Sequence, residues 1–154
     1  MHKSGILKFM VVAVAGLILA QPGMAESSKP YGTMAQSAWS AFQCSVLAEK
    51  SNNLKEQKRL FRVGYEQGLK FIAALESGEA RTGDLPEGSP LSMLLLLQGP
   101  TPDFMLGRIF EVALRSALEN VYTTGDYYNS DEIQESIAAA EFWKRNCTMI
   151  GKSQ

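Results

Sequence analysis

The side chains of this sequence with the clearest capacity for chemistry are its carboxylates. Glu66, Glu111 and Glu141 each precede a basic residue by four positions, and a pair of carboxylates alone can hydrolyse a glycosidic bond. The same spacing is typical of a solvated ion pair on a helix surface, which is the interpretation we favour. We therefore predict no catalytic residue, and a carboxylate-dependent peptidoglycan hydrolase is the least favoured function.

The only histidine, His2, stands just before an apolar run that we expect to be removed from the mature chain. A chain without histidine cannot form a Ser-His-Asp triad, a Cys-His pair or a histidine-ligated metal site. The acidic loop 123–131 lacks the spacing and the glycine of a calcium-binding EF-hand. The formal net charge of −1 provides no basic field for nucleic acid. We predict no metal, no cofactor and no nucleic-acid partner.

Residues 1–25 have the pattern of a cleaved secretory signal peptide. Lys3 and Lys8 precede an apolar run that begins at Phe9 and ends at Ala20. Gly23 and Ala25 form a small-x-small cleavage site. The run is shorter than the roughly 20 residues that span a bilayer. We predict cleavage after residue 25, a periplasmic or secreted protein, and no membrane span once the signal peptide is gone.

The two cysteines, Cys44 and Cys147, both remain after cleavage. In an oxidising compartment two cysteines most simply pair, and neither has a C-x-x-C spacing or a histidine to activate it. A disulfide between them would join the first helix to the last. Closing a loop of about a hundred residues stabilises a fold by up to roughly 4 to 5 kcal/mol on the chain-entropy estimate.

Every long segment has the helical period of three to four residues between apolar positions, and no run alternates as a strand does. Capping residues precede four of these segments, namely Thr33, Asn53, Ser89 and Thr101, and the last segment begins near Ser130 or Asp131. The sequence predicts a flexible arm at 26–32 and one helical domain at 33–154. The fold class is all-α: a compact bundle of four long helices plus one short apolar helix, tied by the disulfide, with helices at 34–49, 54–77, 91–97, 102–122 and 131–149.

Three glycines inside the predicted helices indicate close packing. Gly64 and Gly68 lie four residues apart on the second helix, and Gly107 lies on the helix at 102–122. Each glycine costs about 1 kcal/mol against alanine in a helix interior, so we predict that they allow two helices to cross closely at these three positions. On the last helix we expect an inward apolar face, formed by Ile133, Ile137, Ala140, Trp143, Cys147 and Ile150.

Two segments are the candidates for binding a partner. The apolar helix at 91–97, with Leu91, Met93 and Leu94, is either buried within the monomer, which we favour, or covered by a second copy or another protein. Adjacent tyrosines, Tyr127 and Tyr128, could contact a partner or pack over the end of the bundle.

These features favour a non-enzymatic exported module that binds another protein of the cell envelope, of the inhibitor or immunity type. Either the loops at 78–88 and 123–130 or the apolar segment at 91–97 would form its binding surface. The alternative is an acid- or stress-protective envelope chaperone. The missing histidine and the absence of metal-binding motifs are the main reasons for placing an enzyme last.

Overall fold

A computed structural model describes residues 29–81 and 95–152 of the 154-residue chain. The predicted signal peptide and the positions Leu91, Met93 and Leu94 lie outside the described residues. The described elements are α1 (Lys29–Lys50), α2 (Leu54–Glu76), α4 (Pro102–Tyr122), β1 (Thr123–Thr124), β2 (Tyr127–Tyr128), α5 (Asp131–Lys144) and the short 3-10 helix η2 (Cys147–Met149). The all-α fold predicted from the sequence is confirmed.

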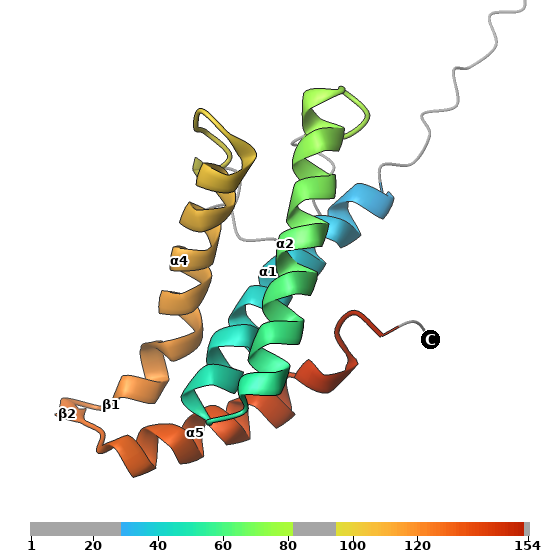
Figure 1. The fold of residues 1–154 in the computed structure, drawn as a ribbon. Helices are drawn as coiled ribbons and strands as arrows, with labels where there is room; N and C mark the ends of the chain where they lie inside the picture. The colour runs from blue at the N-terminus through green and yellow to red at the C-terminus, as the bar shows by residue number, and fades with distance from the viewer. Residues whose placement is uncertain (1–28, 82–94, 153–154) are drawn as a thin grey trace, which may run out of the picture.

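The helices form a small bundle that is closed at one end (Figure 1). α1 and α2 run antiparallel and pack side by side, and this is the most extensive contact between any two elements. α4 packs mainly on α1, and α5 lies across the end where α1 and α4 finish and α2 begins. None of the described helices combines the length and the apolarity needed to cross a membrane.

Local capping explains where several helices begin and end. Asn53, Thr101 and Ser130 each accept a hydrogen bond from the backbone N–H three residues later, at 3.3, 3.2 and 3.5 Å. Such caps satisfy N–H groups that have no partner within the helix. After α2, Gly78 takes a φ of +78°, a conformation that glycine adopts without strain. The predicted starts of α2, α4 and α5 are therefore correct.

Two helix boundaries differ from the prediction. α1 begins at Lys29, so the predicted arm at 26–32 is wrong for its last residues. Proline is tolerated in a first helical turn, and the hydroxyl of Tyr31 donates to Glu79 Oε2 at 2.9 Å, which holds this turn against the end of α2. At the other end α5 stops at Lys144, because Asn146 adopts a left-handed φ of 52°.

The apolar interior divides into two clusters. The upper core includes Trp39, Phe42, Phe71, Leu106 and Ile109. The lower core lies near α5 and includes Leu47, Leu60, Leu118, Val121, Phe142 and both cysteines. Cys44 and Cys147 form a disulfide with Cα atoms 5.5 Å apart, as predicted, and both are buried. The bridge closes a sequence separation of 103 residues and fastens η2 to α1.

The glycines divide into two that lie at close contacts and one that does not. A Cβ atom added at Gly64 would lie 2.6 Å from Phe42 Cδ1 on α1, and one added at Gly68 would clash with Leu106 Cδ2 on α4. At Gly107 an added Cβ would meet nothing within 4 Å. The predicted close crossing at Gly107 is therefore wrong, because α2 meets α4 through the Leu106 side chain one position earlier.

The inward face predicted for the last helix is correct for Cys147, which is fully buried, and wrong for Ile133 and Trp143. The residues of α5 that are buried are Gln134, Ala138 and Phe142. Ile133 is 49% exposed and Trp143 is 67% exposed, although both belonged to the predicted face. α5 is turned so that the stripe ending in Phe142 packs on the lower core. Ile137 and Ile150 are partly buried against that core, whereas Ile133 and Trp143 face solvent.

A short hairpin replaces part of the predicted loop at 123–131. Thr123 pairs with Tyr128 and Thr124 with Tyr127 in an antiparallel ladder. Gly125 begins the two-residue turn with a φ of +61°, as glycine does in the type II′ turns that join hairpin strands. Two residues per strand gave no alternating pattern long enough to recognise in the sequence.

Candidate functional site

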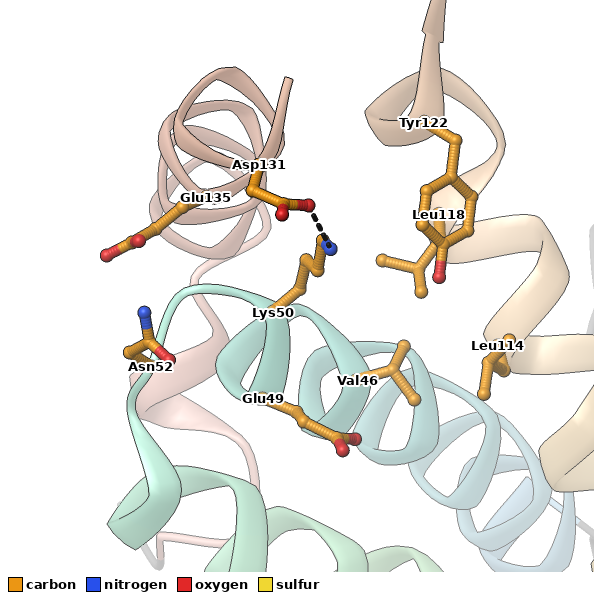
Figure 2. Close-up of a pocket in the computed structure, with 9 residues that line it drawn as sticks. All are labelled: Val46, Glu49, Lys50, Asn52, Leu114, Leu118, Tyr122, Asp131 and Glu135. Atoms are coloured by element: carbon orange, nitrogen blue, oxygen red, sulfur yellow. Dashed lines mark ion pairs between the residues drawn. The ribbon is translucent and has the colours of Figure 1, made fainter. Parts of the chain in front are cut away.

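A cavity lies where α1, α4 and α5 meet at the end of the bundle that α5 covers (Figure 2). Its volume is about 470 Å³, within the range of ordinary ligand pockets. Apolar side chains from α1 and α4 form one part of its lining, and charged or polar side chains from α1, the following turn and α5 form the other. The lining residues are Val46, Glu49, Lys50, Asn52, Leu114, Leu118, Tyr122, Asp131 and Glu135.

Lys50 is the only basic side chain in this lining and is held by two contacts. Its Nζ lies 3.9 Å from Asp131 Oδ1 and 5.5 Å from the centre of the Tyr122 ring. The carboxylate is 93% exposed, so water screens the ion pair and it contributes little to stability. The ammonium group consequently bridges α1 to α4 and α5 without being fixed in place.

Acidic groups outnumber basic ones around the cavity. Figure 2 shows Asp131 turned toward Lys50, whereas Glu49 and Glu135 extend away from it. Only one of the three carboxylates is therefore paired across the cavity. The combination of an acidic rim with walls from Val46, Leu114 and Leu118 suits a basic side chain with an apolar stem.

A buried polar network holds the hairpin next to this cavity. Asn129 Nδ2 donates to the carbonyl oxygen of Val121 at 2.9 Å, and its side-chain oxygen accepts from the Thr124 hydroxyl at 3.0 Å. Gln134 Nε2 donates to the Asn129 carbonyl oxygen at 2.6 Å. Unpaired polar groups in an interior are costly, so these bonds fix the hairpin between the end of α4 and the start of α5.

The tyrosines of the hairpin point into solvent. Tyr127 is 81% exposed and Tyr128 is 72% exposed. The Tyr128 ring stacks on Tyr122 with centroids 6.2 Å apart and an interplanar angle of 8°. Tyr122 also lines the cavity, so the exposed hairpin and the cavity share a wall. We define the tyrosine site as the cavity together with Tyr127 and Tyr128.

Two of the three carboxylates considered for catalysis, Glu111 and Glu141, form ion pairs. Glu111 Oε1 pairs with Arg115 at 3.2 Å on the exposed side of α4. Glu141 pairs with Lys144 at 3.0 Å and Arg145 at 3.3 Å. The hydrogen bond from Lys144, and then that from Arg145, lowers the pKa of Glu141, which is opposite to the shift a general acid requires. Across residues 29–81 and 95–152, no group of three histidine, cysteine or acidic side chains is arranged to hold a metal.

The predicted partner-binding residues fall in different places. Tyr127 and Tyr128 meet at the hairpin, while the described end of the apolar segment lies at the upper core, where Leu96 and Leu97 pack and Leu95 is 64% exposed. No pattern in the sequence predicted the cavity lined by Lys50 and Tyr122. Both stand at helix ends far apart in the sequence, and no local signal indicates that they meet.

No protein-family model, curated protein sequence or solved structure matches this chain. The function is therefore argued from the chemistry of the described surface.

Proposed function

We propose that this protein is a non-enzymatic, exported helical module that binds another protein of the cell envelope, as an inhibitor or immunity protein does. The observation that carries the proposal is the pair of hairpin tyrosines, which are 81% and 72% exposed beside a cavity of about 470 Å³. The surface that the partner contacts is the tyrosine site.

Tyrosine suits a binding surface because its ring supplies apolar contact area and its hydroxyl still reaches water or a polar partner. Here the backbone that carries the rings is held by Asn129, which is 6% exposed, and by Gln134, which is 1% exposed. Little further ordering of this backbone is needed on association, so less conformational entropy is lost. A rigid aromatic pair is typical of residues that contribute most of the energy of an interface.

The charge of the cavity indicates what the partner presents. Glu49 and Glu135 extend away from the only lysine in the lining, and Asp131 is largely exposed. An arginine or lysine of the partner would place its aliphatic stem against Leu114 and Leu118 and its charge near these carboxylates. The proposed partner therefore carries a basic residue beside an apolar contact patch.

Export is supported by the disulfide and by the leader pattern of residues 1–25. Disulfides persist in the periplasm and outside the cell and are rare in the cytosol of mesophiles. The bridge between Cys44 and Cys147 is buried, as expected of a structural bond that reducing agents reach slowly. A periplasmic or secreted location follows from this proposal and is tested by fractionating cells that express the full chain.

The binding experiment compares two variants that each remove exposed aromatic surface. The double variant Tyr127→Ser with Tyr128→Ser should lose at least tenfold in the capture of a partner from an envelope extract, whereas Trp143→Ser should not. Trp143 is 67% exposed at the far end of α5, so its replacement controls for a general loss of non-specific binding by exposed aromatic side chains. The proposed surface would be contradicted if both variants lost partner capture equally, or if neither variant lost it.

A charge-reversal variant tests the basic contact separately. Glu135 is exposed on α5, so the fold should tolerate the substitution Glu135→Lys. It should slow association with the captured partner, and the salt dependence of the association rate should weaken.

An apolar-dye signal that appears only at low pH would favour the chaperone. Peptidoglycan turnover abolished by a single Glu to Gln change would favour the hydrolase.

A further inference from the structure

A second, smaller cavity lies between α2 and α4, away from the tyrosine site. Its volume is about 150 Å³, below the range of drug-sized ligand pockets, so it suits a compact group. One side is an aromatic wall formed by Phe42, Phe61 and Phe110, which come from α1, α2 and α4. Tyr65 and Asp103 also line the cavity.

The aromatic wall is continuous across the three helices. The ring centroids of Phe42 and Phe110 are 5.4 Å apart, those of Phe61 and Phe110 are 5.4 Å apart, and those of Phe42 and Phe61 are 5.8 Å apart. Tyr65 extends the wall by stacking on Phe61 at 6.4 Å. Phe61 is 44% exposed although it contacts three other rings, so the wall is accessible from solvent.

A carboxylate accompanies the aromatic wall. The Tyr65 hydroxyl donates to Asp103 Oδ1 at 2.5 Å, which links α2 to the first turn of α4. This hydrogen bond raises the pKa of Tyr65, so the phenol keeps its proton. Because Asp103 is exposed, its other oxygen remains accessible to a cation.

Gly107 leaves room beside the wall. It lines the same cavity, and a Cβ atom added there would meet nothing within 4 Å. Gly64 and Gly68 are explained by close helix contacts, but Gly107 is not. A glycine in a helix interior costs about 1 kcal/mol against alanine, and at this position the open volume is what the glycine provides.

We propose that this cavity binds a compact quaternary ammonium group, such as the head of choline. Aromatic rings attract a cation through their negative faces, and a quaternary ammonium group also has methyl groups that gain from apolar contact. Asp103 supplies the opposite charge. A quaternary ammonium group has no N–H to donate, so the apolar walls of the cavity leave no donor of the cation unpaired. The inference does not depend on the proposed protein partner.

The test is a titration of the folded, disulfide-bonded protein with choline. Binding is monitored by the shift of the Gly107 amide resonance in a nitrogen–proton correlation spectrum. The matched probe is 3,3-dimethylbutan-1-ol, which has the same shape as choline but no charge. Choline should bind at least tenfold more tightly than this alcohol, a difference equal to 1.4 kcal/mol. Equal affinity for the two compounds, or no saturable shift with choline, would overturn the proposal.

Two variants locate the binding. Gly107→Leu adds a side chain to the cavity from a position where the new Cβ atom meets nothing within 4 Å, so it should keep the fold and abolish the choline-dependent shifts. Asp103→Asn should weaken choline binding severalfold and leave binding of the neutral alcohol unchanged. Choline shifts that persist in Gly107→Leu would place any binding elsewhere and refute this site.

A vesicle experiment separates two sources of the same chemical group. If the head group of phosphatidylcholine is bound, the wild-type protein should sediment with phosphatidylcholine vesicles and Gly107→Leu should not. If free small molecules are bound, choline should saturate the site while neither protein sediments. Either result supports quaternary-ammonium recognition. Sedimentation that Gly107→Leu leaves intact, without choline binding, contradicts it.

Discussion

The same substitution, glycine to alanine, should have opposite effects at two positions of the bundle. At Gly64 the new methyl group would lie 2.6 Å from Phe42 Cδ1 and 2.8 Å from Cε1. Phe42 is 1% exposed and packs against Phe61 and Phe110, so its ring has little freedom to withdraw. At Gly107 the methyl group meets nothing within 4 Å.

The expected magnitudes follow from two terms. Alanine in place of glycine stabilises a helix interior by about 1 kcal/mol. Overpacking a well-filled core costs about 1–3 kcal/mol. Gly107→Ala has only the first term and should be about 1 kcal/mol more stable than the wild type. Gly64→Ala has both, so the two variants should differ by about 1–3 kcal/mol in their free energies of unfolding.

Thermal unfolding followed by circular dichroism checks this difference. For a domain of this size it corresponds to melting temperatures about 3 to 10 °C apart, with Gly107→Ala the higher. Gly68→Ala should fall between them, since its obstacle is the end of the flexible Leu106 side chain. If Gly64→Ala melts as high as Gly107→Ala, the close contact between α1 and α2 at Phe42 is refuted.

Three further predictions concern the junctions that hold the ends of the fold. Replacing both Cys44 and Cys147 by serine should lower the free energy of unfolding by up to about 4 to 5 kcal/mol in a denaturant titration, and a change below about 1 kcal/mol would contradict a stabilising bridge. The hydrogen bond from Arg59 lowers the pKa of Glu56 below 4.5, so its stabilisation is present above that pH and lost as the pH falls through the folded-state pKa. Glu56→Gln should therefore be less stable than the wild type near pH 7 and equal to it at pH 2. Asn129→Ala should cost about 1–3 kcal/mol by removing the side-chain partner of the Val121 carbonyl oxygen and of the Thr124 hydroxyl, and amide exchange should quicken in the hairpin while that of α2 stays slow.

The N-terminal ends of helices were predicted correctly where a single capping side chain determines them. Asn53, Thr101 and Ser130 each bond a backbone N–H three residues away, so the signal and its effect lie within one turn. The start of α1 was missed because it depends on Tyr31 bonding to Glu79, which is 48 residues away. Contacts of that separation leave no periodic or capping trace in a single sequence.

The two candidate sites differ in how far the sequence could indicate them. Adjacent tyrosines in a polar loop are a compositional signal, and Tyr127 and Tyr128 were found in this way. Lys50, Tyr122 and Asp131 were not found, since each separately has the character of an ordinary helix-end residue. Their meeting depends on α5 crossing the ends of α1 and α4, an arrangement set by tertiary packing.

The last helix shows how a correct period can indicate a face that only partly matches the buried one. Its apolar residues recur with helical spacing, yet the stripe that the fold buries contains a glutamine. Gln134 is buried because its amide donates to the Asn129 carbonyl oxygen and joins α5 to the hairpin. With the start of the helix held at that phase, Phe142, two turns further on, enters the lower core and Trp143 turns outward. The hydrogen bond that helps hold the tyrosine hairpin in place therefore also fixes which side of α5 faces solvent.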